Sequence, residues 1–284
     1  MSATFTGSIQ NPVRFARQYN HDLNLTHDLK SSQSFGLNST LGFRYTSNYD
    51  ETNRLGATDL GPGIDIVAGA SQTASQSFTE IRTIGGYLQE QVSIDDQLFI
   101  TGGANLEASS AFGEDVRWQL FPRIGASFIV SDAAWFERTP LNNVFSSMRL
   151  RTAYGQTGGQ PPSAYARYDN FTNISYGGKP GFVASTIAGN PNLKPERQEE
   201  IEAGIDVGML EERANLEFTY YNRKTSDLVL NVPLPLSSGA ASQPQNIGEV
   251  AGWGIEAAIN TINMNRDRFK WTSRLSLSHE QSEV

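Results

Sequence analysis

Apolar and polar residues alternate along most of this chain, so that every second side chain is apolar. The clearest segment is residues 200–207, where Ile201 and Ile205 alternate with Glu202 and Asp206. A period of two places the apolar side chains on one face of an extended strand, which predicts a half-buried β-strand. The same alternation marks further strands over residues 23–29, 35–45, 83–92, 98–107, 124–130, 148–154, 214–221, 255–260 and 269–277.

The length of these strands narrows the fold class. We expect roughly 10 to 14 residues in each, whereas strands of globular proteins usually have ~5–6. Turn signals of a soluble sandwich recur every ~8–12 residues, and the hairpins here recur every ~25 to 45. A transmembrane β-strand needs ~9–11 residues, with apolar side chains facing lipid and polar ones facing the lumen. The pattern therefore predicts an all-β fold, an antiparallel up-and-down transmembrane β-barrel.

The predicted connections differ in length at the two ends of the sheet, as they do in outer-membrane barrels. Tight polar turns are expected at Lys30–Gln33, Ser93–Asp96, Leu210–Arg213 and Met264–Asp267. Long loops are expected at Ser47–Gln76, Gln156–Arg197 and Ser226–Gly248. The connections after residues 107 and 130 are of middling length and fit either end, and Asp132–Phe136 is a candidate short helix.

Composition removes several functional classes. The net charge of −8 disfavours nucleic acid as a partner, because such proteins present a basic face. The absence of cysteine excludes disulfides, cysteine-ligated metal sites and a thiol nucleophile. No apolar run approaches the ~18 residues of a transmembrane helix, and residues 1–6 lack the features of a signal peptide. The chain is therefore expected to be cytosolic or to begin partway through a longer protein.

Several segments resemble successive parts of one protein family. They are Leu106–Gly113, Trp118–Phe128, Met148–Gly158, Gly189–Glu196 and Gly248–Glu256. In this order they resemble barrel segments of the SusC/RagA family of TonB-dependent outer-membrane receptors, and the Gly-Asn-Pro-Asn-Leu-Lys-Pro-Glu segment is similar to one found in TonB-dependent receptors generally. The resemblance covers residues from about 84 to about 260.

The resemblance implies a longer protein with a signal peptide, a TonB box, a plug domain and a barrel of about 22 strands. Residues 1–284 are then expected to be a partial barrel domain of about ten strands, an incomplete barrel without plug, signal peptide or C-terminal strands. The implied function is TonB-dependent uptake of glycans, oligosaccharides or peptides across the outer membrane of a Gram-negative bacterium. The implied partners are outer-membrane lipids, TonB acting through the missing N-terminal region, and a SusD-like surface lipoprotein. With two open sheet edges, the chain expressed alone is expected to aggregate.

The long segment Gln156–Arg197 holds the candidate ligand contacts. Its aromatic residues Tyr165, Tyr168, Phe171 and Tyr176 lie among amides and glycines. Long loops are commonly functional or disordered, and aromatic faces beside amides would suit stacking and hydrogen bonding to a glycan. The alternative is that these rings pack the loop against its neighbours or mark the membrane interface. A wider group of aromatic residues could form interfacial girdles or, in a soluble protein, a core: Trp118, Phe121, Trp135, Tyr154, Tyr220, Trp253 and Trp271.

No enzyme signature is found, and no cofactor or metal is expected. His21 and His27 lie about 20 Å apart on an extended strand, too far to share a metal ion. Glu199, Glu200 and Glu202 fit a solvated or lumen-facing charge run better than the paired carboxylates of a glycosidase. Two other functions remain open: a passive porin or autotransporter barrel, and a soluble extracellular β-sandwich or solenoid that binds carbohydrate.

Overall fold

The computed structural model describes residues 7–30, 34–68, 71–159 and 163–284. Most of the described chain is strand, in these elements: β1 Gly7–Lys30, β2 Phe35–Leu60, β3 Ser71–Ile94, β4 Leu98–Ser109, β5 Trp118–Ile129, β6 Phe145–Gly158, β7 Phe171–Tyr176, β8 Lys179–Ala184, β9 Arg197–Met209, β10 Ala214–Pro233, β11 Ser242–Arg266 and β12 Phe269–Glu283. Three short 3₁₀ turns complete the set: η1 Val130–Asp132, η2 Pro140–Asn143 and η3 Leu236–Ser238. No helix in the described part of the chain is long and apolar enough to cross a membrane.

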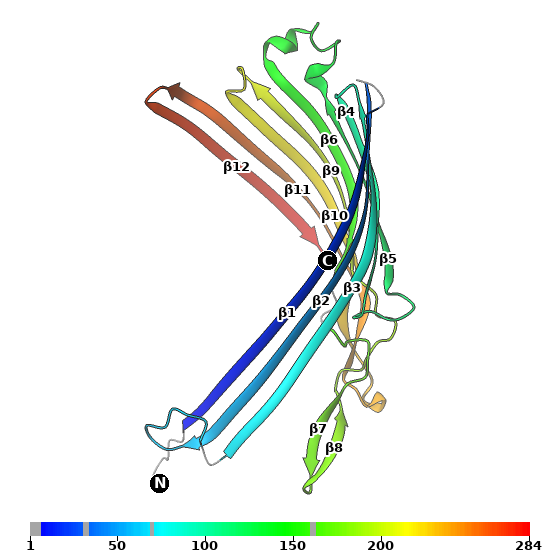
Figure 1. Ribbon diagram of the computed structural model, residues 1–284, viewed down its shortest axis with the longest axis vertical. Helices are drawn as coiled ribbons and strands as arrows, with labels where there is room; N and C mark the ends of the chain where they lie inside the picture. The colour runs from blue at the N-terminus through cyan, green and yellow to red at the C-terminus, as the bar shows by residue number, and fades with distance from the viewer. Residues whose placement is uncertain (1–6, 31–33, 69–70, 160–162) are drawn as a thin grey trace.

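Ten strands form one curved antiparallel sheet in the order β1-β2-β3-β4-β5-β6-β9-β10-β11-β12 (Figure 1). β7 and β8 pair only with each other and form a separate hairpin, which is why β6 pairs with β9. Within the described residues β1 and β12 each have one neighbour, so the sheet is open rather than closed. The predicted all-β, up-and-down topology of about ten strands is confirmed.

The register carries apolar side chains onto one face of the whole sheet. One continuous row of paired positions crosses nine strands and contains only apolar residues: Phe35, Ile94, Leu98, Phe128, Leu150, Ile205, Phe218, Ala257 and Leu277. We call the face that bears this row the apolar face and the opposite one the polar face. Leu150 is 46% exposed and Leu277 65% exposed, so among the described residues no second layer covers these positions of the apolar face.

Two connections are shorter than the sequence predicts. The expected loop Ser47–Gln76 is mostly strand, because β2 continues to Leu60 and β3 starts at Ser71. The expected loop Ser226–Gly248 is also mostly strand, because β10 continues to Pro233 and β11 starts at Ser242. Both predictions were wrong for the same reason. Polar residues replace apolar ones on the apolar face towards the long-loop end, so the alternation stops, but the backbone hydrogen bonds between the strands continue.

The long segment Gln156–Arg197 contains structure that the alternation does not reveal. Between its anchored parts, β7 and β8 form a hairpin closed by Gly177 and Gly178, whose φ angles are +57° and +77°. Two successive left-handed residues make the type I′ turn that suits the twist of a two-residue hairpin, and glycine adopts this conformation without strain. The expectation of a loop without strands was therefore wrong for residues 171–184.

The connections fall on two ends of the sheet. We call the end with tight turns the short-turn end; it holds the connections Ile94–Leu98 and Met209–Ala214 and the turn 267–268. The first predicted tight turn, Lys30–Gln33, falls on residues 31–33, which lie outside the described part of the chain. The opposite, long-loop end holds residues 61–68, 110–117, 163–196 and 234–241.

The β5–β6 connection belongs to the short-turn end, with its 3₁₀ turns at Val130–Asp132 and Pro140–Asn143. The candidate helix Asp132–Phe136 is a succession of turns, so that prediction was wrong. Pro140 and several residues of poor helix propensity, such as Thr139 and Asn142, follow closely and disfavour a continuous helix.

Candidate ligand-facing loops and the wall that holds them

The segment Gly189–Glu196, here called the clamp, organises the long-loop end. Its Leu193 is completely buried, and the Leu193 carbonyl accepts a 2.9 Å hydrogen bond from the backbone of Gly113 in the β4–β5 loop. A Cβ at Gly113 would collide with the carbonyl of Pro191, so this close approach requires glycine. The backbone of Asn190 also donates to Ala166 at 3.0 Å. The clamp thereby ties the β4–β5 loop to the segment that carries Tyr165 and Tyr168.

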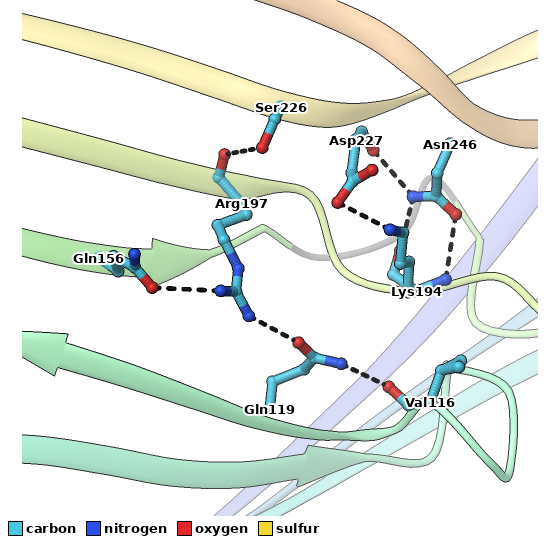
Figure 2. A network of polar contacts seen from close by, with 8 residues as sticks. All are labelled: Val116, Gln119, Gln156, Lys194, Arg197, Ser226, Asp227 and Asn246. Atoms are coloured by element: carbon cyan, nitrogen blue, oxygen red, sulfur yellow. Dashed lines mark hydrogen bonds and ion pairs between the residues drawn. The ribbon is translucent and has the colours of Figure 1, made fainter.

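Amide side chains attach the clamp to the β10–β11 hairpin (Figure 2). Asn246 donates through Nδ2 to the carbonyls of Lys194 and Asp227, both at 2.8 Å, and accepts from the Lys194 backbone at 3.1 Å. Lys194 also forms an ion pair with the Asp227 carboxylate at 3.0 Å. Farther along, Asn190 donates to the Pro244 carbonyl at 2.8 Å. The clamp forms no strand, so its backbone groups need other partners. These amide side chains supply them and hold the clamp in place.

Arg197 closes a gap beside the clamp. The pairing of β5 with β6 ends at Arg123 and Gly155, so the strands separate toward the long-loop end. The Arg197 guanidinium bridges the separated strands: it donates to Gln156 at 3.2 Å and to Gln119 at 3.0 Å (Figure 2). It also lies 5.7 Å above the ring of Phe121, which is only 4% exposed. Phe121 is therefore packed inside the loop end and belongs to no exposed girdle.

The four aromatic residues predicted to contact ligand do not form one cluster. Tyr165 is half-buried, and its hydroxyl accepts a hydrogen bond from the Glu80 backbone at 3.2 Å. Tyr168 lies under the Arg167 guanidinium at 4.2 Å. Phe171 and Tyr176 begin and end β7, on opposite faces of the hairpin, and are 64% and 84% exposed. The structure thus brings Tyr165 and Tyr168 together near the clamp, while Phe171 and Tyr176 lie exposed on the hairpin.

Sequence reasoning missed the second strand of the hairpin. Phe182 on β8 is 74% exposed and pairs with Asn173 on β7, so an aromatic and an amide lie side by side. The signal that could have found it is Gly177-Gly178 between two short strand-like segments, a common hairpin pattern. The β7–β8 hairpin, which carries these exposed rings, extends from the long-loop end of the sheet (Figure 1).

The polar face is crossed by ion pairs between neighbouring strands. Arg44 of β2 pairs with Asp22 of β1 at 2.6 Å, and Asp206 of β9 pairs with Arg149 at 2.6 Å and Arg151 at 3.4 Å, both from β6. A hollow of about 460 Å³ also opens there over β5, β6 and β9. Its lining includes Glu200, Glu202, Gln89, Gln198 and Arg123 over small residues such as Gly125 and Gly155. In the middle of the sheet, the polar face therefore offers hydrogen bonding and charge opposite the apolar row.

Carboxylates and imidazoles do not gather into a metal site. No group of three or more potential ligands is found among the described residues. Glu199 lies on the opposite face from Glu200 and Glu202 and accepts a hydrogen bond from Gln156 at 2.9 Å. His21 and His279 instead lie beside aromatic rings, those of Tyr45 and Trp253.

A hydrogen-bonded carboxylate, Glu51, lies in the part of β2 that extends beyond the alternating segment towards the long-loop end. Glu51 of β2 accepts from Tyr49 at 2.7 Å, Asn53 at 2.8 Å and Gln76 at 2.9 Å. These donors favour the charged form, and the bond from Tyr49 contributes most, so the pKa of Glu51 lies below its ordinary value. The network joins β2 to β3 through side chains as well as backbone.

The comparisons with known proteins agree with this architecture. The model of the family "TonB dependent receptor-like, beta-barrel" matches residues 2–281. TonB-dependent receptor P26 of Formosa agariphila is 27% identical over 262 residues, which are 90% of this chain and 24% of that receptor. TonB-dependent receptor SusC of Bacteroides thetaiotaomicron is 27% identical over 186 residues, 63% of this chain and 18% of SusC.

Solved structures show the same fold. The RagAB peptide transporter superposes with a TM-score of 0.88 at 20% identity, over 99% of this chain and 32% of that chain. The outer membrane transporter YddB from Escherichia coli superposes with a TM-score of 0.62 at 9% identity, over 95% of this chain and 34% of that chain. This chain spans about a quarter or less of the curated relatives. With a family match over nearly its whole length and a ten-stranded sheet of the same design, the chain belongs to the TonB-dependent receptor β-barrel family.

Proposed function

We propose that residues 1–284 form part of the wall and external loops of an outer-membrane transporter that takes up oligosaccharides or peptides with energy delivered by TonB. The observation that carries this proposal is the row of apolar residues that crosses nine strands on one face of the sheet, opposite a face with ion pairs and hydrogen-bonding side chains. Lipid can cover the apolar face, while a barrel lumen is polar. Antiparallel backbone pairing joins each strand between the two edges to both of its neighbours, and such pairing is what a membrane requires.

The orientation follows from the two ends of the sheet. In outer-membrane barrels the short turns face the periplasm and the long loops face outside. The clamp and the β7–β8 hairpin then lie on the cell surface, where a SusD-like lipoprotein could deliver substrate. TonB would act on a plug domain encoded elsewhere in a longer protein, in which this chain is a partial barrel domain. The edges of β1 and β12 would pair with the remaining strands of that barrel.

The substrate class is the finer part of the proposal. The named relatives point in two directions, because one solved neighbour is a peptide transporter and one curated relative is SusC. The exposed hairpin combines aromatic rings with amides, which suits both sugar rings and peptide groups. We therefore place both classes within the proposal and let uptake decide between them.

Uptake by cells tests the proposal. The gene that carries this chain is deleted in its own host, and the uptake of labelled oligosaccharide and peptide mixtures is compared with and without an active TonB system. We expect deletion and loss of TonB function to abolish uptake of the same substrate. Uptake that needs the gene but is independent of TonB would instead support a passive porin and overturn the proposal.

A further inference from the structure

The β5–β6 turn, residues 130–144, folds back onto the apolar face of the sheet. Its residues Val130, Ala133 and Phe136 are 5%, 4% and 1% exposed. They pack against Phe128 and Met148, which belong to the apolar face, and against Phe145. The turn therefore lies on the side of the wall that faces away from the lumen.

Internal hydrogen bonds give the turn a defined shape. The backbone of Phe136 donates to Ala133 at 2.8 Å, and the Thr139 hydroxyl donates to the Phe136 carbonyl at 2.7 Å. Gln97 of the neighbouring β3–β4 turn donates to the Asp132 carbonyl at 2.8 Å. The turn is thus anchored both to its own strands and to the next hairpin.

Large apolar side chains on this ordered turn remain uncovered. Trp135 is 57% exposed, Leu141 48% and Val144 52%. They lie at the short-turn edge of the apolar face, which also carries Trp271 and Phe269 on β12, 54% and 57% exposed. Charged residues Asp132, Glu137 and Arg138 are interspersed with them. Exposed apolar residues mixed with charges are typical of a surface at the boundary between hydrocarbon and water.

We propose that the β5–β6 turn is a lipid-binding foot that inserts Trp135 and Leu141 into the headgroup layer of the periplasmic leaflet, with phospholipid as its partner. This inference rests on the proposed function, because the leaflet is assigned from the orientation of the barrel. Phospholipid is favoured over a protein in the lumen because the turn covers Phe128 and Met148, which lie on the lipid-facing side. Continuity with the exposed apolar rows supports the same occupant.

Nitroxide labels in the intact receptor, reconstituted in phospholipid vesicles, test the foot. The chain has no cysteine, so single labels can be placed through Trp135→Cys, Leu141→Cys, Leu275→Cys and Asp267→Cys once any cysteine elsewhere in the receptor is replaced. Leu275 reports on the apolar face, and Asp267 is a matched control in another tight turn of the short-turn end. Accessibility is measured with oxygen, which enters hydrocarbon, and with a water-soluble nickel complex.

We expect the ratio of oxygen to nickel accessibility to be several-fold higher at positions 135 and 141 than at 267, and highest at 275. Nickel accessibility at 135 and 141 equal to that at 267, with 275 still in lipid, would overturn the foot and leave the transporter proposal intact. Nickel accessibility at 275 as high as at 267 would show that the apolar face meets no lipid, and both proposals would fall. Heat-modifiable mobility on gels confirms that each labelled receptor is folded.

Discussion

The guanidinium of Arg151 lies across Gly204 on the neighbouring strand and reaches the Thr219 hydroxyl on the strand beyond. A Cβ at Gly204 would lie 2.7 Å from Arg151 Cζ, so the crossing requires a residue without a side chain. Tyr87 crosses Gly42 in the same way and donates to Asn24 at 2.7 Å. At these two positions a long polar side chain joins three strands on the polar face across a glycine of the middle strand.

Substitution of the crossed glycine tests this arrangement. Gly204→Ala should displace Arg151 and weaken its contacts with Thr219 and Asp206, at a cost of about 1 kcal/mol in the free energy of unfolding. The measurement is denaturant unfolding of the intact receptor, followed by heat-modifiable mobility. Gly102→Ala is the control, because a Cβ there meets no atom within 4 Å. Arg151→Ala combined with Gly204→Ala should cost less than the sum of the single changes, and additive effects would contradict the crossing.

The clamp should protect the external loop, residues 163–196, from proteolysis. Asn246→Ala removes three hydrogen bonds that hold the Lys194 backbone and the Asp227 carbonyl, so local opening should become easier by about 2 kcal/mol. Trypsin added to whole cells should then cut within residues 163–196 at least several-fold faster. Asn263→Ala is the control, because its hydrogen bond to Ser273 lies at the short-turn end. Equal cleavage rates in both variants would show that the clamp does not restrain the loop.

Acid should weaken the network around Glu51. Its pKa is lowered in the folded protein, so charged Glu51 stabilises the fold above the ordinary glutamate pKa, and this contribution is lost as pH falls through the lowered value. Hydrogen exchange of a peptide covering residues 47–56, corrected for intrinsic rates, should show wild type better protected than Glu51→Gln at neutral pH. The difference should shrink as pH falls below the ordinary glutamate pKa and disappear below the lowered pKa of folded Glu51. A difference that persists unchanged in acid would show that the charge of Glu51 is irrelevant there.

The sequence predicts those strands whose two faces meet different surroundings, one apolar and one polar. Residues 201–207 alternate because one face must be apolar, and the strand was correctly found there. Beyond Tyr45, polar residues such as Ser47 and Glu51 occupy the apolar-face positions, so the pattern disappears although the ladder of β2 continues to Leu60. Backbone hydrogen bonding by itself does not require alternating apolar and polar side chains, so it produces no periodic pattern in the sequence.

The loop end was less predictable because its contacts join residues far apart in the chain. Arg197 meets Gln119 across 78 positions, and nothing near either residue indicates the partner. The resemblance of Gly189–Glu196 to receptor sequences marks the clamp as a unit but gives no sign of what it holds. Its role becomes visible only when Gly113, Ala166 and Asn246 are seen around it.

The aromatic residues of the loop should separate into structural and ligand-binding groups. Tyr176 and Phe182 are largely exposed, so Tyr176→Ala and Phe182→Ala should cost little stability but raise the half-saturating substrate concentration up to about tenfold, or about 1.4 kcal/mol. Tyr165→Phe removes the acceptor for the Glu80 backbone and should loosen the loop without that loss of affinity. Binding is measured by uptake kinetics at matched amounts of receptor in the membrane. Unchanged affinity in both hairpin variants would assign these rings to another contact, because their exposure leaves them no packing role within the described chain.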